Sequence, residues 1–174
     1  MSTLRSASRG PRSPSGRRAA LALLCAGPLL PLSGLAPARE NGLPALTSLA
    51  DDTALVRKTG MPILVLVSIE GCPYCERIRR QHLIPLAREV RPGVLIREVD
   101  MQSTRLIRET AGTSVSQAEW ARRHAVRFAP TVLLLGVGGE LLAEPLVGAS
   151  IPDFYGAYLE ERIRAAQAKL AAPG

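Results

Sequence analysis

Residues 62–78 of this 174-residue chain read PILVLVSIEGCPYCERI. The apolar run at 62–69 is continuous and rich in Val, Ile and Leu, which is typical of a strand buried on both faces of a sheet. Two cysteines, Cys72 and Cys75, follow the run and open a helical pattern that extends to about Val90. The sequence therefore predicts a central strand that leads through a short loop into a helix with a cysteine pair at its start.

Apolar periodicity, turn residues and capping residues predict the remaining elements. We expect helices at 47–59, from 116 and at 153–170, strands at 94–100, 131–135 and 141–147, and a partly helical connection at 101–115. The two strands that follow the Ser116 helix form a hairpin, and Pro85 is expected to interrupt the helix that carries the cysteines. This order implies an α/β fold in which a four-stranded mixed sheet is flanked by helices on both faces.

A cysteine pair with this spacing can form a disulfide without moving the backbone. A bridge that closes so short a loop stabilises the fold little, so its value is expected to be chemical. Cys72, at the positive end of the helix, is predicted to have a lowered pKa and to be the attacking thiolate, and Cys75 is predicted to resolve the mixed disulfide. Pro73 suits the first helical turn, and Tyr74 is expected to shape the rim of the site.

These features resemble the thioredoxin superfamily, specifically exported single-domain bacterial thioredoxin-like proteins with a CPYC active site, over about residues 47–170. The resemblance implies a protein thiol–disulfide oxidoreductase that is a monomer and needs no cofactor. It extends to Ala129, Pro130 and Thr131, where the family holds a cis-proline facing the cysteines. The resemblance also implies that the Ala129 backbone pairs with an extended substrate segment and that Gly148 lines the same groove.

The sequence departs from the family pattern beside the cysteines. Cytosolic thioredoxins usually have Trp before the first cysteine and a buried Asp in the preceding strand, whereas this chain has Gly71 and Leu66. Another group is therefore needed for proton transfer to Cys75. Glu70 is the nearest candidate, and the alternative is that Glu70 is a solvated loop acid. A glutathione-binding pattern is missing, and we predict no dependence on glutathione.

The first 38 residues are predicted to be a secretory signal peptide. They contain five arginines and no acidic residue, and an apolar run follows at 19–32. Small residues at Ala36 and Ala38 predict cleavage after Ala38, with a linker at 39–46 and the folded domain at 47–170. The alternatives are an uncleaved membrane anchor and, from the Arg-Arg pair at 17–18, export by a twin-arginine route.

Export would place the protein in the periplasm, where the expected partners are cysteine-containing exported proteins and a membrane thiol electron transporter. The formal charge of +7 comes mostly from the leader, because the rest of the chain has 17 basic and 15 acidic residues. With few aromatic residues and no basic stripe, the sequence argues against nucleic-acid binding.

Two rival functions use the same residues. A copper or zinc carrier would need more ligands than two thiolates, and only His82 and His124 are available as further imidazoles, each expected to be an exposed helix residue. We therefore predict no metal site. A catalytically inactive scaffold is the other rival, and an intact cysteine pair argues against it.

Overall fold

The computed structural model describes residues 42–90, 92–149 and 152–172. The predicted leader at 1–38 lies outside these residues. The described elements are α1 (Leu49–Thr59), β1 (Ile63–Ser68), α2 (Pro73–Ile78), the π-helical turn η1 (Arg79–Leu83), α3 (Ile84–Ala87), β2 (Leu95–Asp100), β3 (Leu106–Arg108), β4 (Ser114–Ser116), α4 (Gln117–Arg123), β5 (Thr131–Leu135), β6 (Leu146–Val147), the 3-10 turn η2 (Pro152–Phe154) and α5 (Tyr155–Ala171).

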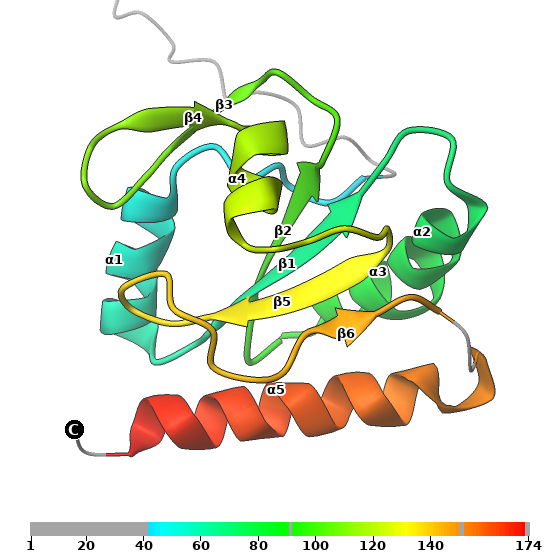
Figure 1. The fold of residues 1–174 in the computed structure, drawn as a ribbon. Helices are drawn as coiled ribbons and strands as arrows, with labels where there is room; N and C mark the ends of the chain where they lie inside the picture. Colours follow the sequence, from blue (N-terminus) through cyan, green and yellow to red (C-terminus); the bar gives the residue numbers. More distant parts are fainter. Residues whose placement is uncertain (1–41, 91, 150–151, 173–174) are drawn as a thin grey trace, which may run out of the picture. The chain divides into compact units, whose positions relative to one another are not determined.

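The main sheet has four strands in the order β2-β1-β5-β6 (Figure 1). Strand β1 is central, as predicted, and every one of its residues is buried. It runs parallel to β2, where Leu66 lies opposite Glu98, and antiparallel to β5, where Val67 lies opposite Thr131. Strand β6 pairs antiparallel with β5 at the edge. This confirms the predicted mixed sheet.

Alternating residues of the central strands contribute their side chains to two separate hydrophobic cores, one on each face of the sheet. Leu64 and Leu66 of β1 pack with apolar residues of α2, η1 and α5 on one face. Val65 and Val67 pack on the other face with residues of α1, β3 and α4, among them the fully buried Trp120. Figure 1 shows α5 along one side of the sheet and α4 on the other. Helices cover both faces because both faces of β1 and β5 are apolar.

The prediction was wrong for residues 101–115, where a helical connection was expected. Strands β3 and β4 form a separate two-stranded antiparallel sheet there. In β3 the buried Ile107 stands between two exposed neighbours, which is the two-residue period of a strand. The turn closes through a hydrogen bond of 2.8 Å from the Glu109 N–H to the Thr113 carbonyl. A three-residue strand is too short to show its period in sequence.

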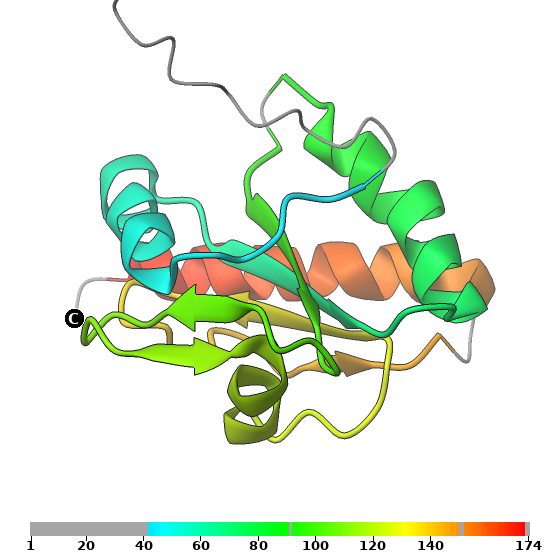
Figure 2. The same cartoon turned by 90° about the horizontal axis from the view of Figure 1, so that it is seen from above.

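The helical stretch after the cysteines is continuous but contains one wide turn. Segments α2, η1 and α3 follow one another from Pro73 to Ala87, and Figure 2 shows them as one rod. The Ile84 N–H donates to the Arg79 carbonyl, five residues back, which marks the π turn. Pro85 comes directly after it, and a proline ring obstructs the regular helical pattern of the preceding turn. Contrary to the expectation, Pro85 therefore does not break the helix but follows a wide turn within it, and the helix ends at Ala87 rather than near Val90.

The segment at 42–46 packs on the sheet although it falls in the expected linker. The Leu46 N–H donates to the Glu98 carbonyl at 2.9 Å, and the Glu98 N–H donates to the Pro44 carbonyl at 2.8 Å. The Leu46 side chain is fully buried. Residues 42–46 thus extend the sheet beyond β2, and the ordered part begins before residue 47.

Ser116 caps α4, as the sequence predicted, and the structure adds a second cap at Ser48 of α1. Ser48 and Ser116 accept hydrogen bonds of 3.1 Å from the backbone N–H three residues on, at the starts of α1 and α4. Gly60 ends α1 with φ +70°, a left-handed conformation that glycine adopts without strain. The start of α4 and the end of α1 therefore agree with the prediction, whereas α1 begins at Leu49 rather than at 47.

Two C-terminal elements differ in detail from the prediction. The strand expected at 141–147 is reduced to β6 at Leu146–Val147 and one bridge between Leu135 and Leu141. Pro145 lies within the predicted strand and cannot donate to a ladder. Helix α5 begins at Tyr155, after the 3-10 turn η2, rather than at the expected residue 153.

Candidate active site

The cysteine pair lies at the start of α2, directly after the loop that follows β1. Cys72 is the N-cap of α2, and the Cys75 N–H donates to the Cys72 sulfur at 3.1 Å. The two residues form a disulfide with their Cα atoms 5.3 Å apart. Cys72 is half-buried, whereas Cys75 is fully buried. A second protein can therefore reach the Cys72 sulfur more readily than the Cys75 sulfur.

The residues between the cysteines lie on the surface. Pro73 takes the first position of α2, where its missing N–H costs no helical hydrogen bond. The Tyr74 side chain is 54% exposed, and the Arg77 guanidinium lies over its ring, 5.6 Å from the centroid. Both residues are thus placed where an approaching protein would meet them.

The peptide bond between Ala129 and Pro130 is cis, as the resemblance implied. Because Val67 pairs with Thr131 in antiparallel strands, Pro130 leaves the sheet at the end where β1 passes into the cysteine loop. The Gly148 N–H donates to the Pro130 carbonyl at 2.8 Å. The register therefore brings Ala129, Pro130 and Gly148 to the same end of the sheet as the cysteines.

Thr131 is placed differently from the other residues predicted to bind substrate. Its side chain is buried, and its hydroxyl donates to the Phe128 carbonyl at 2.7 Å. Burial leaves this side chain no surface to offer a substrate. Thr131 holds the loop before Pro130 instead.

Sequence reasoning missed the apolar side chains beside Pro130. Phe128 is 67% exposed, and Val147, which pairs with Thr131, is 56% exposed. We call Tyr74, Phe128 and Val147 the apolar rim. The sequence offered one sign of this surface, because Phe128 is an aromatic residue two positions before Pro130.

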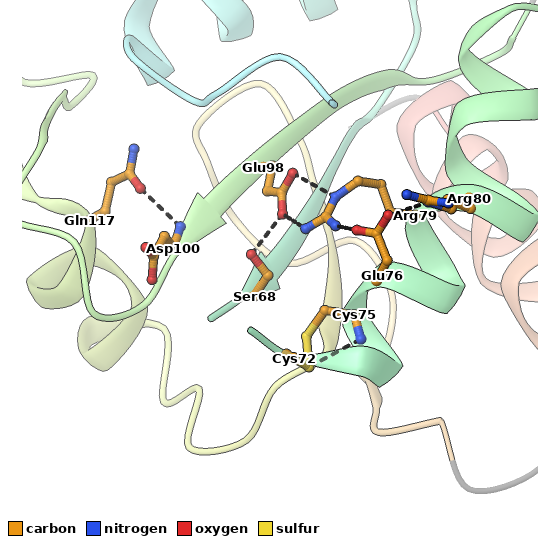
Figure 3. Close-up of polar contacts among 9 residues, drawn as sticks. All are labelled: Ser68, Cys72, Cys75, Glu76, Arg79, Arg80, Glu98, Asp100 and Gln117. Carbon is orange, nitrogen blue, oxygen red and sulfur yellow. Dashed lines mark hydrogen bonds and ion pairs between the residues drawn. A yellow bond between two sulfur atoms is a disulfide. The ribbon is translucent and has the colours of Figure 1, made fainter. Parts of the chain in front are cut away.

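We call the continuous helical segment from Pro73 to Ala87 the cysteine helix. A charge network lies beside it (Figure 3). Ser68, at the end of β1, donates its hydroxyl proton to Glu98 of β2 at 2.7 Å. Glu98 also accepts from Arg79 of η1, whose Nε lies 3.2 Å from Oε2. Arg79 pairs in addition with Glu76, the residue after Cys75, and Glu76 pairs with Arg80.

Glu98 is a further residue that sequence reasoning missed. Glu70 was the expected acid near the cysteines, whereas the acid that lies against the cysteine helix comes from β2. Glu98 is opposite Leu66 in the parallel register, next to the position where the family usually has its buried Asp. A strand register was needed to find it, and the sequence alone does not supply one.

The network changes the proton affinity of two of its members. A hydrogen bond from Arg80 holds the pKa of Glu76 below its ordinary value of 4.5, with Arg79 adding to the effect against partial desolvation. The hydrogen bond to Glu98 raises the pKa of Arg79. Both groups are therefore charged at neutral pH.

The two histidines each pack against an aromatic ring. His82 of η1 lies 5.1 Å from the Tyr155 ring, and burial lowers the pKa of His82. His124 stacks on Trp120 at 3.9 Å between ring centroids. In the part of the chain that the structure describes, no three His, Cys, Asp or Glu residues are grouped to hold a metal ion.

A sequence-family model for the thioredoxin-like domain matches residues 49–163, more than half of the chain. The chain belongs to this thioredoxin-like family. The match covers α1, the cysteine pair, the cis-proline and most of α5. Together with the Cys72–Cys75 disulfide, it identifies the thioredoxin-like chain as a thiol–disulfide oxidoreductase.

Solved structures that are similar to this chain include several thioredoxins. A mutant of poplar thioredoxin h has a TM-score of 0.52 and 17% identity, over 79% of this chain and 92% of that one. Fasciola hepatica thioredoxin is 24% identical over 70% of this chain and 97% of its own, with a TM-score of 0.49. Mitochondrial thioredoxin 3 of Saccharomyces cerevisiae is 21% identical over 70% and 93%, with a TM-score of 0.48. No curated protein matches this thioredoxin-like chain.

Within residues 42–90, 92–149 and 152–172, no helix combines the length and hydropathy that a membrane span requires.

Proposed function

We propose that this chain is an exported thiol–disulfide oxidoreductase that acts on cysteines of other exported proteins, mainly as a reductant. The observation that carries the redox part is the half-buried Cys72 bonded to the fully buried Cys75. The arginine-rich, acid-free leader ahead of an apolar run supports export to the periplasm. A membrane thiol transporter is the proposed source of electrons.

The proposed cycle starts from the reduced pair. The Cys72 thiolate attacks one sulfur of a substrate disulfide, and the other substrate sulfur leaves as a thiolate that takes up a proton. Cys75 then loses its proton and attacks Cys72, which releases the second substrate thiol and leaves the Cys72–Cys75 disulfide. Two electrons pass to the substrate. The membrane transporter then supplies two further electrons, which reduce the Cys72–Cys75 disulfide again.

The substrate is proposed to lie along the cis-proline loop. The Ala129 backbone offers hydrogen bonds to an extended segment, and the apolar rim contacts side chains on either side of the reacting cysteine. Phe128 and Val147 are exposed apolar side chains at this end of the sheet, which supports this placement. The recognised feature is an extended segment around a cysteine.

Substitution of the attacking cysteine tests the redox activity. Cys72→Ser should abolish dithiol-dependent reduction of insulin disulfides, because serine cannot form the mixed disulfide. Ser114→Ala, at an exposed position of β4, is the control and should retain full activity. Reduction at the normal rate by the Cys72 variant would refute the assignment.

Sequencing the N-terminus of the protein recovered from the periplasm tests export. We expect the mature chain to begin at Arg39. Conversion of Arg17 and Arg18 to lysine should leave export unchanged if the general secretory route is used, and should block it if the twin-arginine route is used. A full-length chain recovered with the membrane, or a cytoplasmic chain, would contradict cleavage or export respectively.

The direction of electron flow follows from the midpoint potential of the pair. The midpoint potential of a reductant should lie near that of thioredoxin, about −270 mV, and the midpoint potential of an oxidant should lie at roughly −120 mV. Equilibration with glutathione or dithiothreitol buffers measures it. A value at the oxidising end would overturn the proposed direction and leave the exchange chemistry intact.

A further inference from the structure

The covalent chemistry of the cysteine pair makes no use of the charge network formed by Ser68, Glu98, Arg79, Glu76 and Arg80. Two of its members are largely shielded from water, since the side chains of Arg79 and Glu98 are 16% and 17% exposed. Glu76 and Arg80 are more exposed, at 39% and 71%. The shielded pair is therefore the part whose charges are least screened by solvent.

The network is joined to both cysteines through the backbone. The Glu76 N–H donates to the Cys72 carbonyl at 3.0 Å, and the Arg79 N–H donates to the Cys75 carbonyl. Ser68 is the last residue of β1, directly before the short loop that leads to Cys72. Figure 3 shows Arg79 reaching from the cysteine helix to Glu98, with Ser68 on the other side of the same carboxylate. The pair thus links β2 to the segment that carries the disulfide.

Reduction of the pair changes the charge at this place. The disulfide carries no charge, whereas the reduced pair reacts through a thiolate at Cys72. A positive charge nearby favours the thiolate and hence the reduced form, and a negative charge opposes it. Arg79 and Glu98 carry opposite charges beside the segment that holds the pair (Figure 3), so they act on the redox equilibrium in opposite directions.

We propose that Arg79 and Glu98 are positioning residues that set the reduction potential of the Cys72–Cys75 couple through their opposed charges. This inference rests on the thiol–disulfide activity of the chain. In this chain the acid facing the cysteine helix comes from β2 and is neutralised by an arginine of that helix. Leu66, which is apolar, occupies the neighbouring position on β1.

The chain contains a matched control on the opposite face of the same strand. Arg97 of β2 pairs with Asp52 of α1 at 2.6 Å, and their side chains are 20% and 7% exposed. This pair is as shielded as Arg79–Glu98 and also joins β2 to a helix. It lies on the face that α1 covers, whereas the cysteine helix packs on the other face. Its loss should affect stability without reaching the disulfide.

The test is the midpoint potential of the full chain in which one charge is removed at a time. Glu98→Gln leaves Arg79 less neutralised, which favours the thiolate, so we expect the potential to rise. Arg79→Gln leaves Glu98 less neutralised, so we expect it to fall. Each shift should be about tenfold in the thiol–disulfide equilibrium constant, which is about 30 mV for a two-electron couple.

The double variant and the control pair distinguish charge from structure. Arg79→Gln combined with Glu98→Gln should return to within about threefold of the wild-type equilibrium constant, because both charges are gone. Asp52→Asn and Arg97→Gln should each stay within the same limit. A merely structural role would lower the unfolding midpoint in urea for all four single variants and would not give shifts of opposite sign.

Several results would overturn the inference. It fails if the two single variants shift the potential in the same direction, or if neither shifts it more than the Asp52 and Arg97 variants do. If Arg79→Gln does not fold, Glu98→Gln decides the matter, and Arg79→Lys, which keeps the charge, should stay close to wild type. A wild-type chain without a reversible two-electron transition would instead refute the redox function itself.

Discussion

Cys72 and Cys75 differ in exposure although only two residues separate them. Cys72 caps α2 and is half-buried, whereas Cys75 lies in the first turn of α2 and is fully buried. Burial of the second sulfur restricts attack from outside to the first. The order of events in thiol exchange therefore follows from the place of each residue in the first helical turn.

Alkylation of the reduced protein checks this order. Brief treatment with iodoacetamide at neutral pH should modify Cys72 and leave Cys75 unmodified, as read by peptide mass spectrometry. Both cysteines should react alike in urea, where burial is lost. Equal labelling of the two in the folded chain would contradict the assigned roles.

The lowered pKa of Glu76 predicts a stability that depends on pH. Because the folded chain holds this carboxylate ionised more strongly than the unfolded chain does, its contribution is present above about pH 4.5 and is lost as the pH falls through the folded-state pKa. Glu76→Gln should therefore lose less stability than wild type between pH 7 and pH 3. The difference should be at most about 1 kcal/mol, since Glu76 is partly exposed.

Urea unfolding at the two pH values measures this effect. Glu89→Gln, an exposed position beyond α3, is the control and should keep the pH dependence of the wild type. An equal loss for wild type and the Glu76 variant would show that the pairs with Arg79 and Arg80 add nothing.

Helix α4 shows how a short element is fixed by its cap. It has seven residues, too few for a stable isolated helix. Ser116 accepts the Glu119 N–H at its start, and the buried Trp120 and Ala121 attach it to the sheet. Local capping sets where α4 begins, and tertiary packing supplies most of its stability.

Loss of the cap should be measurable in the whole domain. Ser116→Ala should lower the free energy of unfolding by about 1 kcal/mol, because the Glu119 N–H then lacks its partner. Ser114→Ala, at an exposed position of the adjacent strand β4, is the matched control and should stay within about 0.5 kcal/mol of wild type. Urea denaturation followed by Trp120 fluorescence gives both values.

The main sheet carries a hydrophobic core on each face, and the segment before α1 contributes to one of them. Leu46 is fully buried among residues of α1, β1 and β2, and its backbone bonds to Glu98. The same Glu98 directs its side chain to the opposite face, toward Arg79. The N-terminal extension of the sheet and the charge network thus meet at one residue of β2.

Truncation of Leu46 tests whether this segment belongs to the folded domain. Leu46→Ala should cost about 2–5 kcal/mol in unfolding free energy, as for other fully buried leucines. Leu106→Ala, with a side chain that is 63% exposed, is the control and should change it by about 0.5 kcal/mol or less. A negligible effect at Leu46 would mean that the segment is a linker after all.

Short-range patterns in the sequence predicted the place of the cysteine pair at the start of a helix, the cap at Ser116, the buried β1 strand and the order of most elements. These features depend on residues close together in the chain, so their spacing is visible in the sequence. The position of Pro130 was also predicted, through the resemblance to a known family. The predictions for 101–115 and for 42–46 went wrong because short strands and bridges are stabilised by distant partners.

Strand register lies beyond local patterns for the same reason. Pairing of β1 with β2 and β5 brings Glu98 opposite Leu66 and Pro130 to the end of the sheet that carries Cys72. No spacing in the sequence encodes those contacts, because they join residues about 30 to 60 positions apart. The amino-acid sequence by itself thus determined which sulfurs react. The tertiary structure decided which charges and which surface surround them, because these neighbours are brought together by long-range packing.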